Sequence, residues 1–397
     1  MDLAAIKIAE YSGQRIWMVR AEQGRYFSHF RENSVISIGH LDKFYDHRIT
    51  GKTEIPADEI IRSSIVKHKK YKDEKSKSPK LNGSGNKFYN QILHFIHDIK
   101  KGDIVLTLNS TQVMVGVCQS SKPILRSREL KIVSAPDKPE KIKLSHRLRK
   151  HVEWGPIVDR RAIGGLLSKP FRSQQTVVKL NDFWKEVFGL IYPFFSDGKN
   201  LHFSTYIGRH QDINGKVVSK FFDNLSNVQV IANEIFKGGL SEEFVERLRN
   251  DDVPWDLFAL TAKAHFMSQG AVYSTVPLPP LINPKIAARI VAMLFLLNSG
   301  MIDSSAIEKE VLNGTPASDY TPSTLVDERS AARGGSKNLD RMLSQLVEDK
   351  ELVDQIRKDE KVEKVKDNLK LSIPQHNTSM LEDKAGIKFI TVAADEK

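Results

Sequence analysis

The sequence changes character near residue 181, and this change limits the folds that the chain can adopt. Before that point, short runs rich in β-branched residues, such as 16–20, 34–39 and 103–108, predict strands. After it, long stretches with apolar residues at helical spacing, such as 217–236, predict helices. Hydrophobic residues make up 40% of the chain, which is sufficient for a buried core. The pattern therefore predicts an α+β protein whose strands and helices are largely segregated.

Further breaks in composition divide the chain into four segments. Residues 1–181 combine short strands with a few helices, which is typical of a small β-barrel with flanking helices. Residues 182–312 are predicted to form a mostly α-helical effector or oligomerisation domain. Residues 313–337 contain Gly, Pro, Ser, Thr and Asp without periodicity and predict a linker. An apolar stripe on a charged helix predicts a charged helical tail over 338–397.

The basic residues are concentrated in the first half of the chain. The net charge of the whole chain is +11. Residues 1–200 contain 36 Lys and Arg against 21 Asp and Glu, a net charge of +15, whereas the remaining residues carry −4. Basic surfaces attract polyanions by releasing their condensed counterions. The charge distribution therefore favours a nucleic-acid partner for the first half, although a merely basic cytoplasmic protein is the alternative.

Four motifs in the first 180 residues occur in an order that points to a known family. They are W-x-V-R-A over 17–21 with Gly24, F-x(5)-I-x-I-G over 30–39, K-G-D-x-V-x-T over 101–107, and H-x-x-R-x-x-V-E-W over 146–154. On these motifs the first half resembles the EVE-like branch of the PUA-like superfamily, as it occurs fused to Mrr-type restriction proteins. The resemblance implies recognition of nucleic acid, with a modified base held in an aromatic-lined pocket.

The sequence departs from the family pattern at two places. His40 stands where the family usually has tryptophan after I-G, and the lysine-rich loop 67–87 is longer than usual. His40 is therefore expected to face the pocket with a smaller stacking plane and an added polar group. The alternative is an ordinary surface histidine.

The candidate binding residues are of two kinds, because an extruded base needs flat groups on its faces and donors at its edge or phosphate. For the aromatic candidates the alternative role is core packing, and for the arginines it is a solvated surface. The nucleic-acid-binding residues that we predict are Trp17, Arg20, Phe30, His40, His146, Arg149, Trp154, Arg160 and Arg161.

The sequence has none of the common catalytic or cofactor motifs. P-loop, Rossmann, nucleophile-elbow and H-E-x-x-H patterns are absent, and a single cysteine, Cys118, excludes a disulfide framework. His94 and His97 at helical spacing, and the E-K-I-K run at 140–143, which is similar to the E-x-K element of nucleases, are weak alternatives for a metal or nuclease site. We therefore expect no metal and no cofactor, and the pattern leaves open whether the chain has any catalytic activity.

Together these observations predict a cytoplasmic nucleic-acid-binding protein of a bacterial defence or restriction system, with no membrane partner. DNA is expected in preference to RNA, and the second half is expected to support homo-oligomerisation. A nuclease with an unrecognised active site and an RNA-binding factor are the alternatives.

Overall fold

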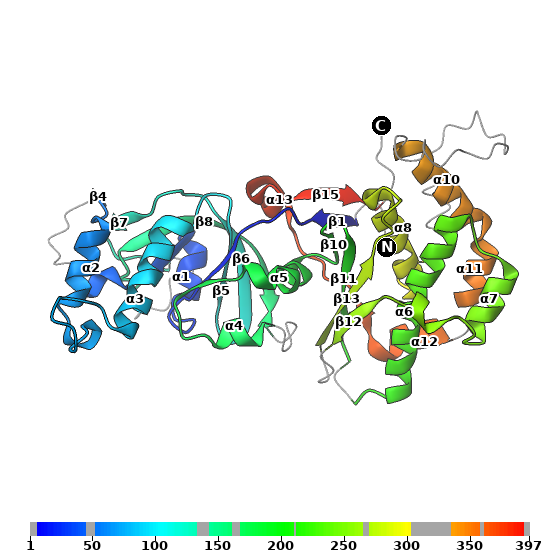
Figure 1. Cartoon of the computed structure of the whole chain (residues 1–397), viewed down its shortest axis with the longest axis horizontal. Helices are drawn as coiled ribbons and strands as arrows, with labels where there is room; N and C mark the ends of the chain where they lie inside the picture. The colour runs from blue at the N-terminus through cyan, green and yellow to red at the C-terminus, as the bar shows by residue number, and fades with distance from the viewer. Residues whose placement is uncertain are drawn as a thin grey trace. The chain divides into compact units, whose positions relative to one another are not determined.

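The computed structural model describes residues 6–44, 52–132, 143–160, 167–209, 212–264, 270–302, 335–357 and 361–392. The chain forms two compact units. Residues 13–184 and 376–387 make up one of them, which we call the half-barrel unit. Residues 1–12, 185–375 and 388–397 make up the other, the sheet-helix unit. Both contain strands and helices (Figure 1), so the predicted α+β class is confirmed.

The half-barrel unit is built on a curled, mixed sheet with the strand order β4-β7-β8-β6-β5-β2-β9, and β3 pairs with β8. Only the β2-β5 pair is parallel; the other pairs are antiparallel. The strands are β2 (Ile16–Val19), β3 (Val35–Ile38), β4 (Lys52–Thr53), β5 (Ile104–Leu108), β6 (Gln112–Cys118), β7 (Ile124–Arg126), β8 (Leu148–Asp159) and β9 (Val177–Lys179).

Helices pack beside this sheet and bury its apolar side chains. The core contains Phe30 of α1, Ile61 of α2 and Ile92 of α3 together with residues of β2, β3 and β8. The helical elements of the unit are α1 (Phe27–Glu32), η2 (Leu41–Lys43), α2 (Asp58–Val66), η3 (Lys69–Tyr71), α3 (Gly83–Leu93), the π-helix η4 (His94–Asp98), α4 (Ser168–Arg172), η6 (Asn181–Phe183) and α13 (Ser379–Ala385).

The K-G-D motif is explained by the packing of this unit. Gly102 has a φ of 88°, a left-handed conformation that glycine adopts without strain. Asp103 follows it and accepts a 3.0 Å hydrogen bond from Nε1 of Trp17 and an ion pair of 2.8 Å from Arg15. Two of the four motifs are thus joined by a contact that fixes β2 against β5.

A buried lysine holds the π-helix against β8. Lys150 is 0% exposed, and its Nζ donates hydrogen bonds to the carbonyl oxygens of Ile96, Ile99 and Ser121. Burial lowers the pKa of this ammonium to about 8, so it is charged at pH 7 and supplies all three of its donors. Lys150 therefore fixes the C-terminal end of the helical segment that begins with α3.

The sheet-helix unit contains a sheet that the sequence pattern did not predict. Its strand order is β12-β13-β11-β10-β1-β15, with β14 pairing to β11, so the helices of this unit pack beside a sheet. Of its strands, the sequence pattern predicts only the one over 202–207, and in β13 the buried Ser274 interrupts the apolar pattern. The strands are β1 (Lys7–Glu10), β10 (Phe194–Ser196), β11 (Asn200–Ile207), β12 (Thr261–Ala264), β13 (Gly270–Pro277), β14 (Leu371–Ser372) and β15 (Lys388–Thr391).

Helix α8 lies between this sheet and the outer helices. It contacts β11 and β15 on one side and α6 and α10 on the other, and it is buried around nearly its whole circumference. A helix in this position needs apolar residues on every face, as its sequence provides. The helical elements of the unit are α5 (Trp184–Ile191), α6 (Gly215–Lys237), α7 (Glu242–Arg249), η7 (Trp255–Leu257), α8 (Pro284–Asn298), α10 (Gly335–Glu348), α11 (Lys350–Arg357) and α12 (Lys361–Leu369).

The two ends of the chain differ from the predicted segments. The predicted tail is integral to both units, because Leu346, Val353 and Leu369 are buried in the core of the sheet-helix unit and residues 376–387 belong to the half-barrel unit. At the other end, β1 pairs with β10 and β15, so residues 1–12 belong to this unit rather than to the first 181 residues. Of the predicted linker, residues 313–334 lie outside the described residues.

Candidate nucleic-acid interface

Two of the recognised motifs meet at Gly39. Strand β3 pairs with β8, which places Ser37 opposite Arg149 and brings the end of the I-S-I-G motif next to His146. A Cβ atom on residue 39 would lie 2.7 Å from Cδ2 of His146, so only glycine leaves room for this ring. Oγ of Ser37 lies 3.1 Å from Nδ1 of His146, and the Tyr26 ring packs edge-on at 4.9 Å. We call this group the histidine corner.

Asp42 gives the histidine corner a titratable carboxyl group. Burial raises its pKa to about 6, although the backbone N–H of Arg147 and the charges of Arg147 and Arg149 oppose the shift. Its Oδ1 is buried and makes no hydrogen bond with the described residues. Burial also lowers the pKa of His146, which favours a neutral ring. At neutral pH the corner therefore combines a carboxylate with a neutral imidazole.

The Asp42→Asn variant is expected to be more stable than the wild type at pH 7.5. The pKa of Asp42 is higher in the folded chain than in the unfolded chain, so its favourable contribution is complete below about pH 4 and lost as the pH rises through 6. The shift corresponds to at most about 3 kcal/mol. Thermal unfolding of both proteins from pH 4 to 7.5 measures it, and a gap that does not grow with pH contradicts the assignment.

Beside the histidine corner, five aromatic or imidazole rings form a continuous cluster. His40 stacks on Phe88 with ring centroids 4.4 Å apart and an angle of 27°, and Phe88 lies 5.0 Å from Tyr71 at 32°. Phe44 contacts Phe88, Tyr71 and His68 edge-on. His68 is exposed and the other four are half-buried. The rings come from three separate segments, so the fold rather than the local sequence assembles them.

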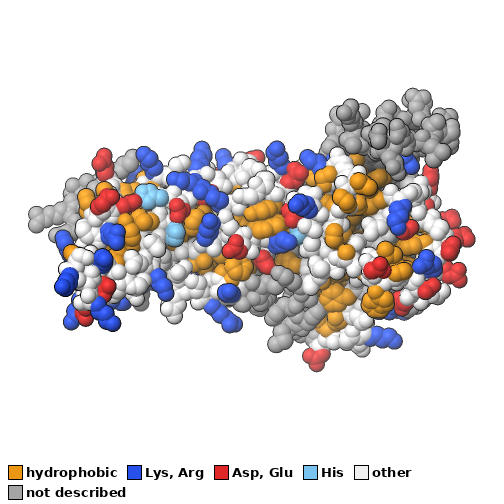
Figure 2. All heavy atoms as spheres, in the orientation of Figure 1, with side chains coloured by type: hydrophobic (Ala, Val, Ile, Leu, Met, Phe, Trp, Pro, Cys, Tyr) orange, Lys and Arg blue, Asp and Glu red, His pale blue; other side chains and the backbone are white. Residues whose placement is uncertain are grey.

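Exposed lysines surround this cluster. Residues 67–87 contain eight lysines against Asp73 and Glu74, a net charge of +6. Figure 2 shows Lys and Arg side chains gathered over the α2 and η3 end of the unit. The lysines, all exposed, are Lys67, Lys69, Lys70, Lys72, Lys75, Lys77, Lys80 and Lys87. We call the rings and these lysines together the aromatic-lysine patch.

The segment that carries the lysines is held in a defined conformation. Asn82 caps α3 by accepting a 2.8 Å hydrogen bond from the N–H of Gly85, and its amide donates to the carbonyl oxygens of Lys70 and Lys72. A Cβ on residue 85 would lie 2.6 Å from the carbonyl oxygen of Tyr71, so glycine permits this approach. The N-G-S-G sequence, which suggested only a loop, therefore positions Tyr71 next to Phe88.

Three of the predicted binding residues are buried and do not present their side chains to a ligand. Trp17 is 2% exposed and Phe30 is 0% exposed, and both lie in the core of the half-barrel unit. Arg149 is 2% exposed, and its guanidinium donates to the carbonyl oxygens of His146 and Arg128. Trp17 and Phe30 therefore occupy the core positions that the sequence left open as their alternative, and Arg149 is buried rather than solvated.

The other predicted residues lie at two places. His40 and His146 lie at the patch and the histidine corner, whereas Arg20 and Arg160 approach Phe171 on α4. Arg20 donates to the carbonyl oxygen of Phe171, and Arg160 lies over its ring at 5.8 Å. Trp154 is half-buried, and its Nε1 donates to the carbonyl oxygen of Phe30 at 2.8 Å. Arg161 lies outside the described residues.

Four members of the ring cluster are absent from the predicted binding residues, namely Phe44, His68, Tyr71 and Phe88. Tyr71 stands within the run K-K-Y-K, and His68 precedes it within the same lysine-rich segment. Aromatic residues between lysines are a signal for binding single-stranded nucleic acid, where bases stack and phosphates are neutralised. Residues 67–87 contain this signal, although their lysine content alone predicts only an exposed charged loop.

The weak alternatives for a metal site do not gain support from the geometry. His94 pairs with Asp98 at 2.5 Å, and His97 pairs with Asp58 at 2.8 Å. Within the described ranges no three His, Cys, Asp or Glu side chains are grouped so that they could hold a metal ion. Of the E-K-I-K run at 140–143, residues 140–142 lie outside those ranges.

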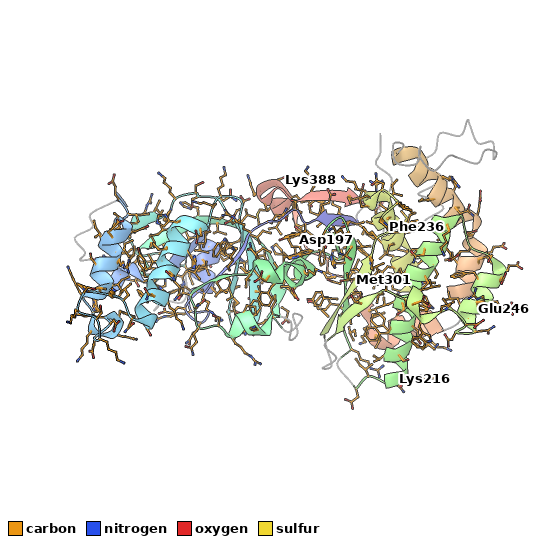
Figure 3. All side chains as sticks on the ribbon, in the orientation of Figure 1. Asp197, Lys216, Phe236, Glu246, Met301 and Lys388 are labelled. Atoms are coloured by element: carbon orange, nitrogen blue, oxygen red, sulfur yellow. The ribbon has the colours of Figure 1, made fainter. Side chains whose placement is uncertain are left out.

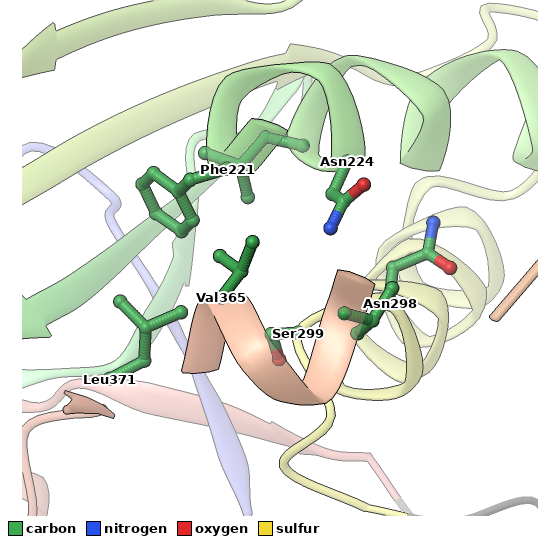
Figure 4. A pocket seen from close by; sticks show the side chains of 8 residues that line it. Phe221, Asn224, Asn298, Ser299, Val365 and Leu371 are labelled. Atoms are coloured by element: carbon green, nitrogen blue, oxygen red, sulfur yellow. The ribbon is translucent and has the colours of Figure 1, made fainter. Parts of the chain in front are cut away.

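The sheet-helix unit contains two further polar features. His202 is buried, with Asp197 at 3.6 Å and Oγ1 of Thr275 at 2.8 Å, and Asp197 lies on the turn between β10 and β11 (Figure 3). A small hollow between α6, α8 and α12 receives the amides of Asn224 and Asn298 (Figure 4). Both are compatible with local packing of this unit.

Comparison with known protein families, with curated proteins and with solved structures gives no match. Among the helices that the structure describes, none has the length and apolar character needed to cross a membrane.

Proposed function

We propose that the half-barrel unit binds nucleic acid, with DNA preferred to RNA, through the aromatic-lysine patch. The observation that carries this proposal is the ring cluster of His40, Phe44, His68, Tyr71 and Phe88 among eight exposed lysines. Lysines neutralise phosphates and flat side chains stack on bases, and the two together are what an unpaired or extruded base requires.

The resemblance to EVE-like domains extends this proposal to modified bases and to a role in bacterial defence or restriction. The histidine corner supports the first point, since Ser37, His146 and Asp42 supply a hydroxyl, an imidazole and a carboxyl group close in sequence or space to His40. Such groups read the polar edge of a base whose faces are stacked.

A binding panel tests the proposed function. Full-length protein is titrated with intact duplex, duplex with one mismatched base, single-stranded DNA and RNA of the same sequence, and methylated or hydroxymethylated duplex, with and without Mg²⁺. We expect the DNAs with unpaired or easily extruded bases to bind more tightly than intact duplex, without cleavage. Equal affinity for all of them contradicts the role of the rings, and cleavage that requires Mg²⁺ supports a nuclease instead.

The triple variant Lys69→Gln/Lys70→Gln/Lys72→Gln is expected to weaken binding of every sequence alike. Each phosphate contact contributes about 0.7–0.9 to the slope of log affinity against log salt, so the loss of three contacts lowers the slope by about 2. The matched control neutralises three exposed lysines outside the patch, Lys101, Lys122 and Lys179. If both variants reduce the slope equally, overall charge rather than the patch determines binding.

A further inference from the structure

The sheet-helix unit presents one large aromatic side chain almost entirely to solvent. Trp255 of η7 is 90% exposed, and Leu257 beside it is 39% exposed. The segment that carries them is anchored on both sides, because Val253 is 6% exposed in the core and the N–H of Ala259 donates a 2.8 Å hydrogen bond to Oε1 of Gln229. The tryptophan is therefore displayed from a fixed turn, although its burial would remove a large apolar area from water.

Acidic side chains surround this tryptophan in the sequence and on the preceding helix. Residues 242–256 contain six acidic residues against Arg247 and Arg249, a net charge of −4. Figure 2 shows Asp and Glu side chains gathered over the α7 end of the unit, and Glu246 lies on α7 in Figure 3. The exposed acidic residues are Glu242, Glu243, Glu246, Asp251, Asp252 and Asp256. With Trp255 and Leu257 they form what we call the acid-tryptophan surface.

We propose that the acid-tryptophan surface binds the aromatic-lysine patch of a second copy of the chain. The two surfaces carry opposite net charges, −4 and +6, and each combines charged side chains with aromatic ones. Lysines bind over the face of tryptophan more favourably than over any other ring. Tryptophan is also among the residues that most often dominate an interface when they become buried.

The geometry of such an assembly follows from the location of the surfaces. They lie on different units of the chain, and each copy has one surface of each kind. Copies therefore associate through reciprocal contacts in a closed pair or head to tail in a ring or open filament. Because nucleic acid uses the same lysines, it competes with assembly; this consequence rests on the proposed function, whereas the self-association does not.

Two complementary variants of the full chain test the contact without nucleic acid. The first, Lys69→Glu/Lys70→Glu/Lys72→Glu, removes the patch, and the second, Asp252→Lys/Trp255→Ser/Asp256→Lys, removes the acid-tryptophan surface. In sedimentation at low salt the wild type is expected to form concentration-dependent assemblies, and each variant alone is expected to remain a monomer. An equimolar mixture is expected to give a dimer and nothing larger, because one intact contact remains.

Controls separate this contact from general electrostatics. Asp223→Lys/Asp367→Lys changes the charge of exposed sites on α6 and α12 by the same amount and should leave assembly unchanged. Trp255→Ser alone should weaken association about thirtyfold, the loss typical of a central tryptophan.

The outcomes separate the two proposals. A wild type that stays monomeric, or a mixture that forms no dimer, overturns the proposed contact. The acid-tryptophan variant keeps the aromatic-lysine patch and should still bind nucleic acid. If neither it nor the wild type binds nucleic acid, the proposed function is wrong, whereas the proposed self-association is unaffected.

Discussion

Replacing Lys150 by methionine is expected to destabilise the half-barrel unit by about 3 kcal/mol, the cost of leaving buried hydrogen-bonding groups without partners. The ammonium of Lys150 donates to the carbonyl oxygens of Ile96, Ile99 and Ser121, and methionine fills the same volume without donating to any of them. Hydrogen-deuterium exchange of the full chain measures the effect, because protection of the amides over 94–100 should fall first.

Lys101→Met is the matched control, since this lysine is exposed in the same unit. It should leave exchange over 94–100 unchanged. If Lys150→Met were as stable as the wild type, the cost of burying the charge would equal the gain from its hydrogen bonds, and Lys150 would not be the anchor of the π-helix. Because α3 continues directly into that helix, loss of the anchor should also weaken nucleic-acid binding through Phe88.

The second large effect is expected from Tyr71→Leu/Phe88→Leu. Leucine retains an apolar side chain against the core of the half-barrel unit but has no flat face for a base. Base stacking contributes about 1–3 kcal/mol per base, so loss of one platform should weaken binding of single-stranded DNA about thirtyfold. The salt dependence should not change, because every lysine of the patch remains.

Comparing the salt dependence of binding in the lysine variant and the leucine variant separates loss of phosphate contacts from loss of base stacking. The lysine variant is expected to lower both the affinity and the salt slope, whereas the leucine variant lowers the affinity only. Thermal unfolding of the leucine variant close to that of the wild type excludes loss of fold as the cause. An unchanged affinity for single-stranded DNA would show that the rings serve packing alone.

The sequence predicted most elements of the half-barrel unit because their local signals agree with the fold. Glycine residues flank its strands. The pattern of apolar residues in α2 and β6 matches the residues that are buried in the structure. In the sheet-helix unit the same reasoning found α6, α7 and α8, but it missed β1, β13 and β15. Strands β1 and β15 are short and pair over long separations, so no local pattern indicates them. In β13 the buried Ser274 interrupts the apolar run.

The candidate site was only partly predictable for a related reason. Two of the motifs, one ending at Gly39 and one beginning at His146, meet in the structure because β3 pairs with β8. They did not distinguish side chains that support the fold, such as Trp17 and Arg149, from those that face outward. The ring cluster depends on contacts between Phe44, Tyr71 and Phe88, which come from separate segments.

The exchange of strands between the ends of the chain has a consequence for its synthesis. The chain crosses between the two units four times, and Ile8 of β1 pairs with both Phe194 and Ile390. At about 5–20 residues per second, β1 waits roughly 10–40 s for its first partner strand and longer for the second. A chain released early would keep an open sheet edge, and it would also lack α13, which packs on β6 and β8. Incomplete products are therefore exposed to aggregation and proteolysis until β15 and α13 have been synthesised and complete both units.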